Sequence, residues 1–261
     1  DGVVDIVWTL PGYTAGRFPT IEVFELPFMA ASAEATSQAA QEFYEKYARE
    51  DFADIHPLMI HVHAPGTLHM RDREVKTLED LNRVKIRAPT RMTNAALEAL
   101  GAVPVGMPVP AVPESLARGV IEGTALPYEV TLPLKVHELT SSHTEIGGNR
   151  GLYTAVFLFA MNKARYESLP ADLRRVIDDN SGIPLAQKIG RVWDEAEVPG
   201  RKAAADLGDS FYTIEGDELL RWQAATTGVT EAWIAEMDAA GKDGRALVEE
   251  AKALIAKYAG E

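Results

Sequence analysis

Arg87 is the residue whose type and position most clearly suggest chemistry, because it ends a short apolar strand in the run VKIRAP. Val84 and Ile86 favour a strand and point to one face, so Arg87 points to the other. Ala88 precedes Pro89 and is therefore biased to extended backbone, so the chain leaves the strand without starting a helix at once. A guanidinium there presents a planar fork of donors at the strand end, where open α/β sheets bind ligands. The position predicts an arginine that binds a carboxylate; the competing interpretation is a surface or ion-paired arginine.

His61 and His63 provide a rival hypothesis, because the pair H-x-H ends an apolar strand. Alternate strand residues point the same way, so both imidazoles could share one metal ion. The pair resembles the start of the zinc site in metal-dependent amidohydrolases, which are (β/α)₈ barrels. The residues that could complete such a site are His69, His137 and His143 as ligands and Asp54 or Asp72 as a base.

The barrel hypothesis is the weaker one, because the sequence lacks eight βα units and the remaining metal-binding motifs of that family in order. We therefore expect no metal site and place His63 in the wall of a ligand cleft. The sequence also lacks a G-x-S-x-G elbow, a G-x-x-x-x-G-K-[ST] phosphate loop and a dinucleotide fingerprint. These observations predict a protein without catalytic residues and without a cofactor.

Strands and helices alternate along the chain, which predicts an α/β sheet with a helical C-terminal region. Strands are expected at 3–10, 56–62, 152–161 and 211–214, the third buried on both faces. Helices are expected at 32–50, 93–100, 112–118, 167–179, 184–207, 217–238 and 245–258. Pro199-Gly200 should bend or interrupt the helix at 184–207. Thr77 begins a near-capping box, and the inner faces of the last two helices should carry Trp222, Trp233, Leu247 and Leu254.

Composition restricts the possible partners. The chain has 261 residues, 46% of them hydrophobic, and a net charge of −13. Nucleic acid and an anionic membrane surface would repel this charge, so neither is an expected partner. The sequence lacks cysteine, which suits a bacterial periplasmic protein, and it lacks a run of about 18 apolar residues.

A longer pattern surrounds Arg87. In order, the chain carries Asp80-Leu81, KIRAP at 85–89, LGAVPVGMP at 100–108, GVIEG at 119–123 and Pro127. This run resembles the DctP-like solute-binding proteins of tripartite ATP-independent periplasmic (TRAP) transporters. Their pattern is D-L-x-G-L-K-I-R-x-P, a helix, L-G-A-x-P-V-x-M-P, and a second helix ending in G-V-x-D-G before a proline. Further similar segments are DGVVDIVWTL at 1–10, FELPF at 24–28, MNK at 161–163 and LPADL at 169–173.

The resemblance implies a two-lobed periplasmic-binding-protein architecture with an interlobe cleft and a long hinge helix. Lobe I would comprise 1–63 and 153–192, lobe II 64–152, and the helices in 193–261 would brace both. The implied function is a periplasmic receptor that closes over a small organic carboxylate and presents it to a TRAP membrane permease. An extracytoplasmic ligand sensor on the same scaffold is a further possibility.

The resemblance also implies particular site residues. The family arginine that matches Arg87 pairs with the ligand carboxylate. Other cleft positions match Trp8, Thr9, Leu10, Val109 and Leu126, and Tyr128 and His63 are expected nearby. Thr67 stands where some members have a second arginine, so that contact is expected to be missing. Because these side chains are less polar than a sugar-acid site requires, we expect a monocarboxylate with an apolar or aromatic body.

Three departures from the family pattern stand out. Arg83 replaces a glycine, which costs roughly 1 kcal/mol if the turn there is left-handed. Glu122 replaces an aspartate. Asp1 falls where the family has already formed a strand, a helix and a second strand, so the first lobe is expected to be incomplete at its N-terminal side.

Overall fold

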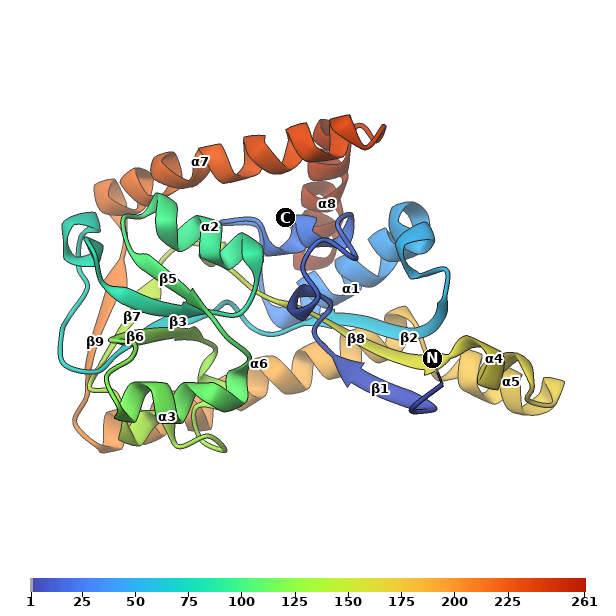
Figure 1. The fold of residues 1–261 in the computed structure, drawn as a ribbon, viewed down its shortest axis with the longest axis horizontal. Coiled ribbons are helices and arrows are strands. Elements are labelled where there is room, and N and C mark those ends of the chain that lie inside the picture. Colours follow the sequence, from blue (N-terminus) through green and yellow to red (C-terminus); the bar gives the residue numbers. More distant parts are fainter. Residues whose placement is uncertain (1) are drawn as a thin grey trace.

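Two β-sheets lie side by side in the computed structural model, which describes residues 2–261 (Figure 1). The first sheet is antiparallel and has the order β1-β8-β2, formed by Ile6–Thr9, Val156–Asn162 and Ile55–Val62. The second has the order β5-β4-β6-β3-β7-β9, formed by Val103–Gly106, Lys85–Ala88, Gly123–Leu126, Thr67–Met70, Ser142–Ile146 and Ser210–Ile214. The predicted two-lobed α/β fold is confirmed.

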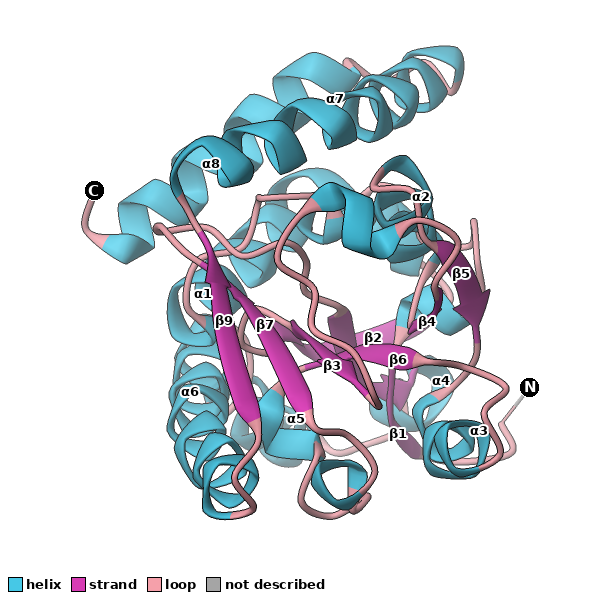
Figure 2. Cartoon of the chain, turned by 90° about the vertical axis from the view of Figure 1, so that its left-hand side faces the viewer, coloured by secondary structure: helices cyan, strands magenta, loops and turns pink. Residues whose placement is uncertain are grey.

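Eight α-helices of the described chain surround these sheets. They are α1 (Ala33–Phe43), α2 (Arg91–Ala99), α3 (Val112–Ala117), α4 (Lys163–Glu167), α5 (Ala171–Asp179), α6 (Ile183–Asp206), α7 (Gly216–Ala239) and α8 (Gly244–Ala259). Figure 2 shows α7 and α8 above the sheets and α6 on the opposite side. Among the described residues, no helix combines the length and apolar character needed to cross a membrane.

Each sheet has its own apolar core, and α7 contributes to both. Trp233 packs with Phe24 and Ile60 in the core of the first lobe, whereas Trp222 packs with Ile86 in that of the second. The inward positions predicted for the last two helices are buried. Helix α7 therefore packs against both sheets.

Strand β8 is the central strand of its sheet and is largely buried, as its apolar run predicted. Several elements differ from those expected. Strands β5, β6 and β7 were not among the expected strands, and the helix expected at 32–50 is α-helical only over Ala33–Phe43. Strand β3 lies among the buried strands of the second sheet but lacks a distinctive pattern in the sequence. Strand β9 pairs in parallel with β7, so the region 193–261 contributes a sheet strand in addition to helices.

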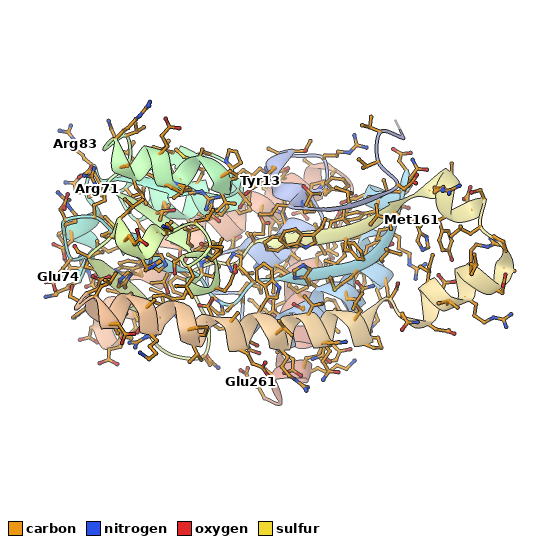
Figure 3. All side chains as sticks on the ribbon, turned by 90° about the horizontal axis from the view of Figure 1, so that it is seen from below. Tyr13, Arg71, Glu74, Arg83, Met161 and Glu261 are labelled. Atoms are coloured by element: carbon orange, nitrogen blue, oxygen red, sulfur yellow. The ribbon has the colours of Figure 1, made fainter. Side chains whose placement is uncertain are left out.

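Helix α6 runs without interruption through Pro199 and passes beneath both lobes (Figure 3). Of the two predicted effects of Pro199-Gly200, a bend or an interruption, the interruption does not occur. Close packing of α6 against other backbone segments, at Gly190 before the proline and Gly200 after it, explains why the helix continues. A Cβ at Gly200 would overlap the backbone of Tyr128, and a Cβ at Gly190 would overlap that of Ala33. Such close approaches outweigh the one helical hydrogen bond that proline removes.

Carboxylates of α6 reinforce this packing at one point on each lobe. Asp194 accepts the N–H groups of Ala33 and Glu34 at 2.7 and 2.9 Å, at the start of α1. Glu197, three residues later, accepts the N–H groups of Tyr128 and Glu129 at 3.0 and 2.9 Å, at the start of a short 3₁₀ turn. Because helix N-termini have unsatisfied donors, each carboxylate serves as a cap.

The turns predicted before Arg87 are confirmed. Thr77 and Asp80 form a full capping box. Arg83 has φ +64°, so the turn before β4 is left-handed, and its N–H donates to the Gly101 carbonyl at 3.0 Å. These turns fix the start of β4 and thereby the position of Arg87 at its end.

Candidate ligand-binding site

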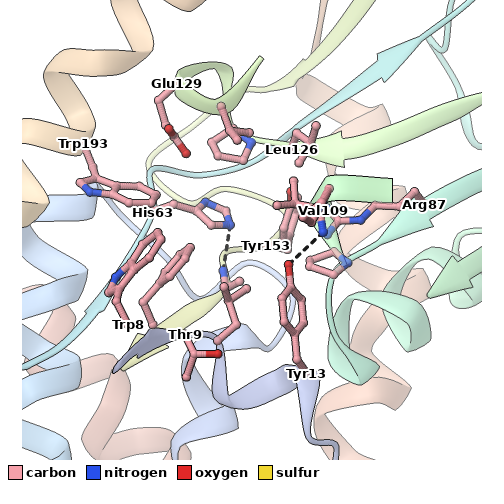
Figure 4. Close-up of a pocket in the computed structure, with 17 residues that line it drawn as sticks. Trp8, Thr9, Tyr13, His63, Arg87, Val109, Leu126, Glu129, Tyr153 and Trp193 are labelled. Carbon is pink, nitrogen blue, oxygen red and sulfur yellow. Dashed lines mark hydrogen bonds between the residues drawn. The ribbon is translucent and has the colours of Figure 1, made fainter. Parts of the chain in front are cut away.

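A cavity of about 310 Å³ lies between the lobes (Figure 4). Both lobes and α6 form its wall, and most of the wall is apolar or aromatic. The lining residues are Trp8, Thr9, Leu10, Tyr13, His63, Arg87, Pro89, Val109, Pro110, Leu126, Pro127, Glu129, Val130, Tyr153, Ala155, Phe157 and Trp193. This volume lies at the lower end of the roughly 300–1,000 Å³ found for small-molecule sites.

Arg87 provides the positive charge of the cavity. Its side chain is 1% exposed, at the carboxyl end of β4, where the parallel neighbours β5 and β6 also end. Its Nε donates to the carbonyl of Met107 at 3.0 Å and its Nη1 to that of Ala125 at 3.1 Å. These two bonds fix the guanidinium, and the Tyr13 hydroxyl is a further neutral partner of this side chain.

The charge of Arg87 has no acidic partner among the described residues. Burial lowers its pKa, although the hydroxyls of Tyr153 and Tyr13 act in the opposite direction. An unpaired buried charge is costly, so an anion entering the cavity would relieve that cost. The alternatives of a surface arginine or an ion-paired arginine are both excluded by the structure.

Aromatic rings form the side of the cavity that belongs to the first lobe and α6. Trp8 and Phe157 stack with ring centroids 4.9 Å apart and planes 8° apart. Trp193 of α6 lies 4.9 Å from Phe157 and 6.1 Å from Trp8, tilted against both. Trp8 remains 52% exposed, so its ring has a free face. Such a wall suits a flat ligand.

The imidazoles of His61 and His63 are already fully engaged, which contradicts a metal site on this pair. His61 Nε2 accepts the indole N–H of Trp8 at 2.9 Å, and its Nδ1 faces the Val62 carbonyl. His63 Nε2 accepts the Ala155 N–H at 3.0 Å, and its Nδ1 donates to the Ala64 carbonyl. Burial lowers the pKa of both rings to about 4, so they are neutral. The described residues also contain no cluster of three or more metal-ligating side chains.

Glu129 is the acidic group of the cavity and lies at the opposite end from Arg87 (Figure 4). Its backbone N–H is bound by Glu197. Burial, followed by the negative charge of Glu197, raises the pKa of Glu129 to about 7. The cavity is therefore cationic at one end and changes charge near neutral pH at the other.

Most of the predicted site residues line this cavity: Arg87, Trp8, Thr9, Leu10, His63, Val109 and Leu126. Thr67 and Tyr128 lie outside its wall, contrary to expectation. Thr67 is buried in β3, and the ring of Tyr153 packs against the preceding Gly66. The Tyr128 ring instead packs against His69 and His143, and its hydroxyl donates to Glu145 at 3.1 Å.

Several lining residues were not predicted, chiefly Tyr13, Glu129, Tyr153, Phe157 and Trp193. Phe157 had a detectable signal, because it belongs to the apolar run that forms the buried strand β8. Tyr13 follows the breaker pair Pro11-Gly12 at the end of β1, and its hydroxyl accepts the Val109 N–H at 3.1 Å. Trp193 depends on how α6 is rotated about its axis, which its sequence does not specify.

Two lobes around an aromatic cavity with one buried arginine define a solute-binding receptor. Comparisons identify its kind. Residues 1–236 match the family model for bacterial extracellular solute-binding protein, family 7, and the chain belongs to this family.

Two solved TRAP solute-binding proteins are similar over nearly the whole chain. One, from a marine metagenome, is described as specific for aromatic acid ligands and was solved with 3-hydroxybenzoate. It is 52% identical with a TM-score of 0.97, over 99% of this chain and 81% of that chain. The other, from Rhodoferax ferrireducens, contains copurified benzoate. It is 49% identical with a TM-score of 0.97, over 100% of this chain and 81% of that chain.

A more distant relative is the ectoine/5-hydroxyectoine-binding periplasmic protein UehA of Ruegeria pomeroyi. It is 26% identical over 99% of this chain and 76% of its own length. The protein is thus a TRAP solute-binding protein with the two-lobed fold of that class.

Proposed function

We propose that this protein captures an aromatic monocarboxylate, of the benzoate or hydroxybenzoate type, with Arg87 as the anchor of the carboxylate. The observation that carries the proposal is a buried guanidinium, without an acidic partner among the described residues, that faces an otherwise aromatic cavity. Relatives that share about half of its sequence bind aromatic acids.

Arg87 alone cannot supply the binding free energy, so the aromatic part of the cavity must contribute as well. A hydrogen-bonded charge contributes about 1.5–3 kcal/mol, whereas micromolar affinity requires about 8 kcal/mol. Arg87 is therefore an anchor for one end of the ligand. Stacking against Trp8, Phe157 and Trp193, together with closure of the lobes, supplies the remainder.

The same proposal places the protein in the periplasm, as a receptor without catalytic activity that delivers its ligand to a TRAP permease. The family assignment and the periplasmic relative support this placement. Osmotic-shock fractionation tests the location. Benzoate uptake by cells that carry the permease, with and without this receptor, tests the partnership.

Isothermal titration calorimetry tests the ligand assignment. The wild-type protein should bind benzoate and 3-hydroxybenzoate and should reject succinate and ectoine. Neither has an aromatic ring for the flat wall, and succinate has a second carboxylate for which the cavity offers no second cation. Arg87→Ala should lower benzoate affinity at least a hundredfold. Arg118→Ala is the matched control, because Arg118 is exposed and pairs only with Glu114 on its own helix.

Two results would overturn the proposal. One is benzoate affinity that survives Arg87→Ala in a protein whose unfolding shows an intact fold. The other is a wild-type protein that ignores aromatic acids but binds a dicarboxylate or ectoine.

A further inference from the structure

The hydroxyl of Tyr153 is a buried polar group without a partner. Among the described residues, four buried side-chain nitrogen or oxygen atoms lack a hydrogen bond: Glu25 Oε2, Thr124 Oγ1, Tyr153 Oη and Arg174 Nε. Of these four residues, Tyr153 is the one that lines the ligand cavity. A buried hydroxyl that has lost water without gaining a partner is destabilising, so this atom calls for an explanation.

Packing fixes the hydroxyl in place. Tyr153 is 1% exposed, and its ring meets that of His63 edge to face at 5.4 Å. On the other side the ring and hydroxyl lie directly on Gly66, where an added Cβ would overlap them. The Gly66 N–H in turn donates to the Tyr153 carbonyl at 3.0 Å. Glycine at 66 therefore makes room for this phenol, and the ring has little freedom to seek another partner.

The hydroxyl also lies within the field of Arg87, since the charge of Arg87 acts on the pKa of Tyr153 and the phenol acts on that of Arg87. Burial outweighs this effect and raises the pKa of Tyr153, so the phenol keeps its proton. A protonated hydroxyl in the same cavity wall as a guanidinium is a donor, and a carboxylate oxygen is the acceptor that suits it.

We propose that Tyr153 is a second partner of the ligand carboxylate, so that its hydroxyl and the guanidinium of Arg87 bind the carboxylate oxygens together. The idea rests on the proposed aromatic-acid function and specifies its carboxylate end. Thr67, next to Gly66, stands where some family members have a second arginine and cannot supply that cationic contact. In this chain the neutral hydroxyl of Tyr153, which packs on Gly66, makes the second contact to the carboxylate. Such an arrangement favours one carboxylate per ligand.

Tyr153→Phe tests the assignment by calorimetry with benzoate, 3-hydroxybenzoate and phenylacetate. Affinity should fall about ten- to hundredfold, the range for one hydrogen bond to a charged group. The factor should be the same for all three ligands, because they share only the carboxylate and the ring. Thermal unfolding of the ligand-free variant should occur at the wild-type temperature or above it, because the change removes an unsatisfied buried hydroxyl. Tyr128→Phe is the matched control: it removes a buried hydroxyl outside the cavity and should leave affinity unchanged.

Failure of this inference can be distinguished from failure of the proposed function. If the wild type binds benzoate and Tyr153→Phe binds it equally well, Tyr153 is not a ligand. A loss confined to 3-hydroxybenzoate would place the hydroxyl on the ring substituent and would also overturn the proposal. A crystal structure of the wild type with benzoate decides the matter without a variant: the phenol oxygen must lie within hydrogen-bond distance of the carboxylate.

Discussion

Two arginines four residues apart, at the end of β4 and the start of α2, have opposite environments. Arg91 is paired by Glu22 and Glu236, so it joins α2 to the loop before α1 and to α7. Arg87 is more deeply buried, yet only backbone carbonyls and tyrosine hydroxyls accompany it. The carboxylates raise the pKa of Arg91, whereas burial lowers that of Arg87.

The difference shows how the fold separates a structural arginine from one that binds a ligand. Arg91 has its counter-charges within the chain and contributes to stability whether or not a ligand is present. Arg87 lacks one, so the chain bears a desolvation cost that a ligand can offset. The following predictions test this contrast, beginning with the largest effect.

Replacing Arg87 by methionine should abolish the stabilisation that a ligand provides. At benzoate concentrations a hundredfold above the dissociation constant, the wild type should gain about 2.7 kcal/mol of unfolding free energy. Arg87→Met should gain almost none, and without ligand it should be at least as stable as the wild type. Chemical denaturation with and without benzoate measures both quantities. A marked loss of ligand-free stability would show that Arg87 is structural like Arg91.

Replacing Arg91 by methionine should produce the opposite result. The change leaves the buried Glu22 without its partner and should lower the free energy of unfolding by about 2–3 kcal/mol. Benzoate affinity should remain within about twofold of the wild type, because Arg91 does not line the cavity. The same denaturation and calorimetry experiments apply, and a large loss of affinity would remove the distinction between the two arginines.

Trp193→Leu should separate ring recognition from charge recognition. Loss of one aromatic contact should lower benzoate affinity about five- to tenfold, from about 1 kcal/mol of stacking. Calorimetry with benzoate and with cyclohexanecarboxylate checks the cause. The affinity for cyclohexanecarboxylate should fall less than the affinity for benzoate. Equal losses of affinity for both ligands would indicate that Trp193 only fills space.

Benzoate affinity should fall severalfold as the pH rises from 6 to 8. Glu129 has its pKa raised to about 7, so below that pH it is mostly protonated and above it mostly ionised. The added negative charge opposes an anionic ligand, which is ionised throughout this range. Neighbouring groups are Glu197, whose pKa is also raised to about 7, and His63, which stays neutral. Glu129→Gln should remove most of this dependence of benzoate affinity on pH. If the affinity of the variant still falls as in the wild type, the dependence would instead be due to Glu197.

How far the sequence predicted this molecule depends on how local each signal is. The end of β4 and the turn at Arg83 follow from neighbouring residues, so Arg87 could be placed correctly. Tyr153 and Trp193 enter the cavity through long-range packing, on Gly66 and beneath both lobes respectively, and no short pattern encodes either contact. The same reason explains why α6 continues through Pro199, since the backbones of two other elements hold it there.

Helix α6 carries a further consequence, because Asp194 and Glu197 fasten it to opposite lobes less than one turn apart. Two lobes fastened to the same turn of α6 can rotate about that turn but cannot slide along the helix. We expect distances between spin labels on α3 and α5 to change on benzoate binding while labels near 193 stay almost still; large shifts at 193 would contradict this. Trp193 lies at this pivot, so it should stay in place when the lobes open. A departing ligand should therefore lose its hydrogen bonds to Arg87 before it loses its contact with the Trp193 ring.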